Sequence, residues 1–128
     1  MNYIQNPNGK SLGRHILLEL YNCDADFLNQ TETIEKILVQ TAELGNATIV
    51  ETSFHQFSPF GVSGVVVIAE SHLTIHTWPE HQYAAVDLFT CDNEMDTKIM
   101  VNYLVKEFKA GSFEEKLFLR GIPEKVLV

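Results

Sequence analysis

The chain has 128 residues, of which 45% are hydrophobic and 20% charged, a composition typical of a single globular domain. Nine Lys and Arg against 17 Asp and Glu give a net charge of −8, which argues against electrostatic binding to nucleic acid. The sequence shows no secretory signal pattern, which predicts a cytoplasmic protein whose two cysteines are reduced thiols. It shows no long apolar run, so no interaction with a membrane is expected.

The first ten residues are polar and predict a loose N-terminal arm. Residues 11–23 are the first predicted strand, because a mostly apolar run at their centre requires at least one buried face. Residues 24–46 predict a helix, with Asn29 and Glu32 as a capping box near its start. The apolar side of this helix is expected to face the core and consists of Ile34, Ile37, Leu38, Ala42 and Leu44.

Four β-rich segments follow, and the turns between them are too short to hold crossover helices. These strands should therefore be antiparallel, and they span residues 47–57, 62–69, 72–78 and 83–91. A second helix is predicted at 96–111, with Asp96 as its N-cap and an apolar stripe of Met100, Leu104 and Phe108. A last strand at 112–122 precedes a short tail. The order predicts an α+β fold, a two-layer sandwich in which one antiparallel sheet carries two helices on one face.

The run AESHLTIHTWPE, residues 69–80, carries more polar chemistry than a strand requires. His72 and His76 share a strand face with Glu70, so a zinc site is conceivable, but no cysteine stands at ligand spacing and no HExxH pattern is present. Hydrolase chemistry is disfavoured because no GxSxG motif surrounds Ser71. Taken one at a time, these residues fit ordinary structural roles, so only their combination indicates a function.

The combination resembles the self-processing site of the short prokaryotic S-adenosylmethionine decarboxylases. The similar segments are SLGRH (11–15), GNATIV (45–50), SPFGVSGVVVIAESHLTIHTWPE (58–80) and YAAVDLFTC (83–91). The last third of the chain shows little resemblance. The resemblance implies a single domain, residues 1–128, that cleaves itself autocatalytically between Glu70 and Ser71 into a beta chain, 1–70, and an alpha chain, 71–128.

The resemblance also implies the chemistry of this cleavage. The Ser71 hydroxyl would attack the Glu70 carbonyl, and elimination from the resulting ester would convert residue 71 into a pyruvoyl group, one per active site. This group would form a Schiff base with S-adenosylmethionine and accept the electron pair that remains when CO₂ leaves. Cys91 resembles the residue that donates a proton to the substrate Cα carbanion after CO₂ has left. The product would be decarboxylated S-adenosylmethionine, which is the aminopropyl donor for spermidine and other polyamines. No metal is implied.

Other residues take roles through the same resemblance. Ser63 and His76 would assist processing, with His76 as the acid–base group. Phe57 and Trp78 would stack on the adenine ring, and an aromatic face also suits a sulfonium cation. Glu80 would bind the ribose hydroxyls.

A hairpin with its tip at Glu70–Ser71 would place Ser63 opposite Trp78 and diagonal to His76. Ser63 and His76 would then share a face but lie far from Ser71, so a single chain could not assemble the site. A twofold homodimer could, with shared active sites in which Ser71 and Cys91 of one subunit meet residues of the other. The residues expected from the second subunit are Phe57, Ser63, His76 and Glu80.

Three other functions remain open from the sequence. A pyruvoyl-dependent decarboxylase of arginine or ornithine would keep the processing serine but should lose the adenosine-binding residues, which are present here. An unprocessed, inactive homologue would act as a binding or regulatory subunit. A zinc-binding module is the third.

Overall fold

The structure, a computed structural model, describes residues 11–122 and 124–126. The expected N-terminal arm lies outside these residues, and so does part of the expected tail. Within the described part of the chain, neither helix has the length and apolar character that a membrane span requires.

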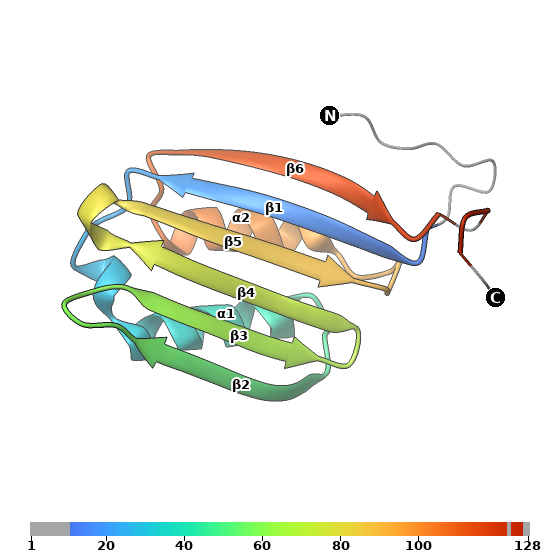
Figure 1. Cartoon of the computed structure of the whole chain (residues 1–128), viewed down its shortest axis with the longest axis horizontal. Helices are drawn as coiled ribbons and strands as arrows, with labels where there is room; N and C mark the ends of the chain where they lie inside the picture. Colours follow the sequence, from blue (N-terminus) through green and yellow to red (C-terminus); the bar gives the residue numbers. More distant parts are fainter. Residues whose placement is uncertain (1–10, 123, 127–128) are drawn as a thin grey trace.

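Six strands form one antiparallel sheet in the order β2-β3-β4-β5-β1-β6 (Figure 1). Strands β2 to β5 are neighbours in both sequence and space, as the short turns predicted. Strand β1 instead lies between β5 and β6, paired with β6 over its whole length and with β5 from Arg14 to Tyr21. The strands are β1 (Gly13–Tyr21), β2 (Ile49–Gln56), β3 (Val62–Ile68), β4 (Ser71–Trp78), β5 (Tyr83–Thr90) and β6 (Ser112–Arg120).

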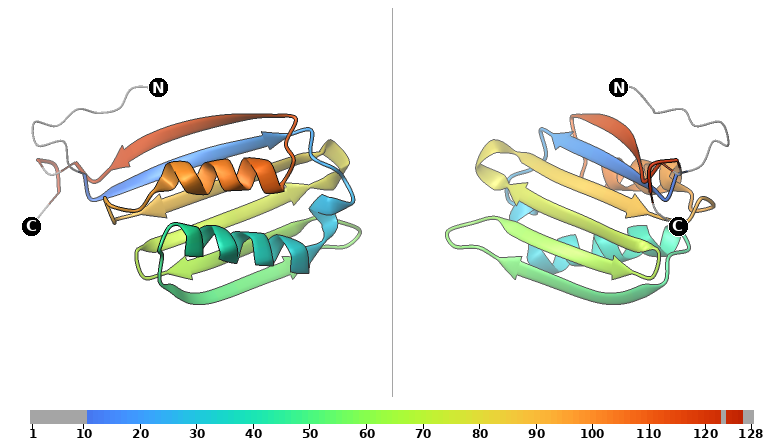
Figure 2. Two further views of the ribbon diagram at one scale, coloured as in Figure 1. Left: turned by 180° about the vertical axis from the view of Figure 1, so that it is seen from behind. Right: turned by 45° about the vertical axis from the view of Figure 1, so that its right-hand side comes forward.

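Two helices, α1 (Thr31–Leu44) and α2 (Thr97–Glu107), cover one face of the sheet (Figure 2). The predicted α+β two-layer sandwich is therefore confirmed. Asp96 caps α2 as predicted, since its carboxylate accepts a hydrogen bond from the Ile99 N–H at 3.1 Å. Leu44 is the one member of the predicted helix stripes that stays outside the core, because it is the last residue of α1 and is 45% exposed. The buried members are Ile34, Ile37, Leu38, Ala42, Met100, Leu104 and Phe108.

The start of the first helix differs from the prediction. Residues 27–29 form a 3₁₀ turn, η1 (Phe27–Asn29), and α1 begins only at Thr31. The predicted capping box is wrong, because the Asn29 side chain serves the β2–β3 loop instead. Its Oδ1 accepts hydrogen bonds from the Gly61 N–H and from Gln56 Nε2, each at 2.8 Å. Asn29 therefore holds the loop that carries Phe57.

The other face of the sheet is not covered by a helix in the described part of the chain (Figures 1 and 2). On β4, alternate side chains such as Leu73 and Ile75 enter the core, while His72, Thr74 and His76 lie on this open face. A hollow of about 730 Å³ lies on it, lined by residues of β1 to β5. The polar chemistry of β4 thus faces away from the helices.

Candidate active site

Strands β3 and β4 form a hairpin whose two-residue tip is Ala69–Glu70, because Ile68 pairs with Ser71. Ser71 has a φ of 152°, a conformation that residues with side chains rarely adopt, so the backbone directly after the Glu70–Ser71 bond is strained. The Glu70 carbonyl oxygen accepts a hydrogen bond from the Cys91 N–H at 2.9 Å. The bond expected to be cleaved therefore has a strained residue on one side and a polarised carbonyl on the other.

The register of the hairpin differs from the prediction. Ser63 lies opposite His76, not opposite Trp78, because the tip lies one residue earlier than expected. The register therefore shifts by two residues, and an even shift leaves every side chain on its predicted face. The Ser63 hydroxyl and His76 Nδ1 are in fact in direct contact, at 2.5 Å.

His76 belongs to a row of rings at the end of β4, which we call the aromatic cluster: Phe57, His76, Trp78 and Tyr83. Ring centroids are 5.8 Å apart for Phe57 and His76, 4.2 Å for His76 and Trp78, and 5.2 Å for Trp78 and Tyr83. Phe57 is 41% exposed, so its ring can accept a partner. Burial and the nearby Glu19 carboxylate, to which the Tyr83 hydroxyl donates, raise the pKa of Tyr83.

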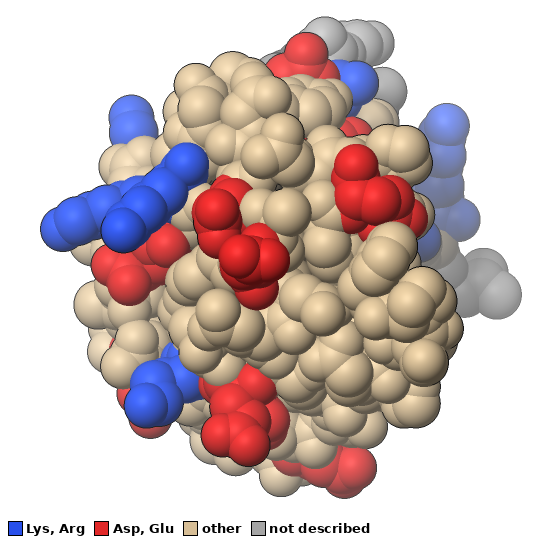
Figure 3. Space-filling model, turned by 90° about the vertical axis from the view of Figure 1, so that its left-hand side faces the viewer, with Lys and Arg blue, Asp and Glu red and all other residues tan. Residues whose placement is uncertain are grey.

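Glu80 is exposed and lies in the adjoining 3₁₀ turn, η2 (Pro79–His81). Figure 3 shows the end of the molecule that includes this turn, where acidic side chains are spread over the surface and the Lys and Arg side chains lie mainly toward the edges of the view. This end of the sheet is therefore better suited to a cation than to a polyanion.

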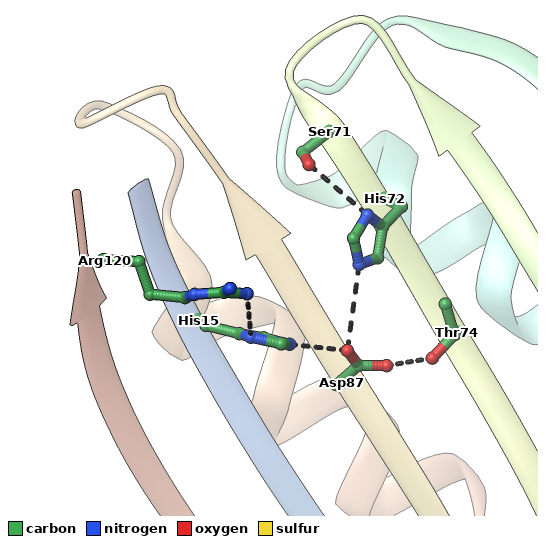
Figure 4. Close-up of polar contacts among 6 residues, drawn as sticks. All are labelled: His15, Ser71, His72, Thr74, Asp87 and Arg120. Atoms are coloured by element: carbon green, nitrogen blue, oxygen red, sulfur yellow. Dashed lines mark hydrogen bonds and ion pairs between the residues drawn. The ribbon is translucent and has the colours of Figure 1, made fainter. Parts of the chain in front are cut away.

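A second group of polar side chains, which we call the Ser71 cluster, surrounds the start of β4 (Figure 4). Ser71 Oγ lies 3.4 Å from His72 Nδ1, and His72 Nε2 lies 3.8 Å from Asp87 Oδ2. His15 Nε2 lies 2.5 Å from the same Asp87 oxygen, and Thr74 donates to Asp87 Oδ1. The members of the cluster come from β1, β4, β5 and β6 and are His15, Ser71, His72, Thr74, Asp87 and Arg120.

Cys91, the predicted proton donor, directly follows β5 at the same end of the sheet as Ser71. Its side chain is exposed, and it lines a small hollow together with Phe89 and Arg120. The other cysteine, Cys23, is completely buried, and burial raises the pKa of its thiol to about 11. Of the two thiols, only that of Cys91 is placed to react.

The predicted site residues therefore form two groups at opposite ends of the sheet. Ser71 and His76 are five residues apart on one strand, a separation of about 17 Å at the usual rise per residue. Ser71 and Cys91 lie at one end, and the aromatic cluster with Ser63 and Glu80 lies at the other. The structure confirms the expected separation of Ser71 from Ser63 and His76.

The residues of the zinc alternative are not brought together. His72 and His76 are about 13 Å apart along the extended strand, too far to share one ion. The Glu70 carboxylate points elsewhere, since Oε1 accepts a hydrogen bond from the Thr48 N–H at 3.1 Å.

His15, Asp87 and Tyr83 belong to these groups and were not predicted from the sequence. Asp87 had a detectable signal, because it is the only charged residue in the apolar strand YAAVDLFT. His15 had none, because it reaches Asp87 only through the pairing of β1 with β5, which joins distant parts of the chain.

Known proteins resemble this chain along almost its whole length. The family model described as S-adenosylmethionine decarboxylase matches residues 14–121. A protein of Clostridium kluyveri named S-adenosylmethionine decarboxylase proenzyme is 51% identical over 116 residues, which cover 91% of this chain and 92% of the relative. A proenzyme of the same name from Caldicellulosiruptor saccharolyticus is 53% identical over 115 residues, which cover 90% and 93%.

The fold has a close counterpart among solved structures. The crystal structure of the adenosylmethionine decarboxylase from Aquifex aeolicus superposes with a TM-score of 0.83 at 36% sequence identity. The match covers 93% of this chain and 98% of that one. This chain belongs to the S-adenosylmethionine decarboxylase family.

Proposed function

We propose that this chain is the proenzyme of a pyruvoyl-dependent S-adenosylmethionine decarboxylase that cleaves itself between Glu70 and Ser71. The observation that carries the proposal is the state of this bond in the intact chain, where a strained Ser71 follows a carbonyl that is already hydrogen bonded. The mature enzyme removes CO₂ from S-adenosylmethionine and so produces the aminopropyl donor for polyamine synthesis. Membership of the family supports both the reaction and the substrate.

Cleavage begins when Ser71 Oγ attacks the Glu70 carbonyl carbon and the amide becomes an ester. The negative charge that develops on the Glu70 oxygen is stabilised by the Cys91 N–H, which already donates to this atom. The shift relieves the backbone strain at Ser71, which favours the forward direction. Elimination then releases the 1–70 fragment with a free carboxylate. Addition of water and loss of ammonia leave a pyruvoyl group at residue 71.

The pyruvoyl group supplies an electron sink for decarboxylation, and the surrounding residues position the substrate and move protons. Cys91 is placed to return a proton to the substrate carbon that has lost CO₂, because it adjoins residue 71 and its thiol is exposed. Phe57 and Trp78 offer ring faces for the adenine and the sulfonium, and Glu80 offers a carboxylate for the ribose hydroxyls.

The active enzyme is a homodimer with shared sites. The reacting group and the substrate-binding group lie about 17 Å apart on the open face of one sheet, so one subunit cannot complete a site. A twofold axis between two open faces would place the Ser71 end of one subunit over the aromatic cluster of the other. Each site would then combine Ser71 and Cys91 of one chain with Phe57, Ser63, His76, Trp78 and Glu80 of its partner.

The family match gives no support to an arginine or ornithine decarboxylase, and the grouping of Phe57 and Trp78 near Glu80 argues for an adenosyl substrate. The unprocessed homologue is tested directly by the mass of the purified protein. The wild type should give two fragments, 1–70 and 71–128, with the second blocked to Edman degradation. Ser71→Ala should give a single chain of 14.5 kDa. A folded wild-type protein that stays full length after prolonged incubation would refute the proposal.

A further inference from the structure

His72 is the histidine that contacts the cleavage serine within one chain. Its Nδ1 faces Ser71 Oγ at 3.4 Å, and its Nε2 faces Asp87 Oδ2 at 3.8 Å (Figure 4). An imidazole that carries its proton on Nε2, toward the carboxylate, presents the free electron pair of Nδ1 to the serine. This is the tautomer that a general base for Ser71 requires.

The Asp87 carboxylate is fixed in place by other members of the Ser71 cluster. The Arg120 guanidinium lies 3.3 Å from His15 Nδ1, and since arginine can only donate, this nitrogen of His15 accepts. His15 Nε2 must then carry the proton, which it donates to Asp87 Oδ2 at 2.5 Å. Thr74 holds the second carboxylate oxygen. The Asp87 carboxylate is thereby held in one orientation, about one fifth exposed, with Oδ2 toward the ring that takes up the serine proton.

We propose that His72 is the general base of self-cleavage in its own chain and that Asp87 positions it. This inference rests on the proposed self-cleavage and adds a residue to it. As Ser71 Oγ bonds to the Glu70 carbonyl carbon, its proton passes to His72 Nδ1. When the C–N bond breaks, the imidazolium returns this proton to the departing nitrogen of residue 71. The step is an isomerisation from amide to ester, so it needs no water, metal or oxidant.

The groups around His72 support this role. Asp87 on β5 and His15 on β1 face the His72 ring from one side, and Arg120 on β6 lies behind His15. On β3, the residue paired with His72 is the apolar Val67. His76, in contrast, is about 17 Å from Ser71 in the same chain and can act only from the partner subunit. The two histidines therefore have separate tasks: His72 takes the serine proton, and the partner's His76 acts from the opposite side of the site.

The first test is the rate at which freshly translated precursor turns into the two fragments, followed by gel and mass analysis. His72→Ala should slow this rate by about 100-fold or more, the usual size of a lost general base. His81→Gln, an exposed histidine at the opposite end of β4, should cleave as wild type does. Asp87→Asn should give an intermediate rate, because the imidazole stays but loses its charged partner.

Two further readouts separate a catalytic role from a structural one. Added imidazole should restore part of the cleavage of His72→Ala, since it supplies the missing base in the space that the side chain leaves. Wild-type cleavage should accelerate across the range in which imidazoles titrate, about pH 5 to 8, and His72→Ala should lose most of this rise. A defect caused by altered folding would respond to neither.

Co-expression of His72→Ala with Ser71→Ala tests whether the base belongs to the same chain. A mixed dimer never combines an intact Ser71 with an intact His72 in one chain, so the His72→Ala chain should be cleaved no faster in the mixture than when it is expressed alone. Faster cleavage of the His72→Ala chain in that mixture than alone, or cleavage at the wild-type rate when it is expressed alone, would overturn the inference. These outcomes leave the proposed function intact, because only an uncleaved wild type would refute that.

Discussion

Mixed dimers of two inactive variants provide the sharpest test of the shared active site. Ser71→Ala cannot form a pyruvoyl group but still offers its His76 to a partner. His76→Ala keeps its serine but cannot supply the histidine. These residues lie about 17 Å apart on one strand, so each site takes Ser71 from one chain and His76 from the other. In a dimer of either variant alone, every site lacks one of the two groups. Each variant alone should therefore fail to cleave and should have almost no activity.

The expected recovery follows from the symmetry of the dimer. Random pairing gives about half of the dimers one chain of each kind, and each mixed dimer has one site with both groups intact. About a quarter of the wild-type sites should therefore return in the unfractionated mixture, and about half in mixed dimers purified through both tags. The second site of the same dimer combines both defects and stays inactive. The cleaved chain should always be the His76→Ala chain.

The assay is co-expression of the two variants with tags of different mass, followed by purification through both tags. Intact mass analysis then identifies the cleaved chain, and release of labelled CO₂ from S-adenosylmethionine measures the recovered activity. Wild type carrying the same pair of tags is the control for pairing. If purified mixed dimers show neither cleavage nor activity, the site lies within one subunit and the reasoning from distance is wrong.

Three other predictions concern single residues. Cys91→Ala keeps the backbone N–H that donates to the Glu70 carbonyl, so this variant should cleave normally. It should turn over poorly and lose activity progressively, with alanine appearing at the start of the 71–128 fragment. If the variant has the turnover rate and the active lifetime of the wild type, the thiol has no part in the mechanism. Iodoacetamide at about pH 8 should alkylate Cys91 and spare Cys23, since a pKa of about 11 leaves on the order of one Cys23 thiol in a thousand ionised; equal labelling in the folded protein would contradict the burial. Thr77→Val should lower the free energy of unfolding by about 2 kcal/mol, because the buried Val62 N–H and the Leu28 carbonyl lose the hydroxyl that both bond to. Urea unfolding of the uncleaved chain measures this change, and unaltered stability would show that these groups find other partners.

Local pattern was sufficient for much of the fold and part of the site. The alternation along β4 is a property of neighbouring residues, so the common face of Ser63 and His76 was predictable even though the exact register was not. The register depended on which two residues form the hairpin tip, and the run from Ala69 to Ser71 left this open because it contains no Gly, Pro, Asn or Asp to mark the turn.

Tertiary partners explain what the sequence analysis missed. Asn29 fits a capping pattern, but the Gly61 N–H and the Gln56 amide, about thirty residues away in sequence, take its side chain instead. In the same way, His15 and Asp87 meet because β1 inserts beside β5. No local periodicity encodes that insertion, and the Ser71 cluster depends on it.

The position of β1 also determines what the proposed cut does to the molecule. Residues 1–70 contribute β1, β2 and β3, and residues 71–128 contribute β4, β5 and β6, yet β1 is hydrogen bonded on both edges to strands of the second fragment. The cleaved halves are therefore interlaced, and neither can leave without opening the middle of the sheet. The cut is chemically irreversible, because residue 71 no longer has the amine from which the peptide bond could re-form. Once unfolded, the two proposed fragments would have to find each other by diffusion, so the persistence of the cleaved protein would depend on how slowly the interlaced sheet opens.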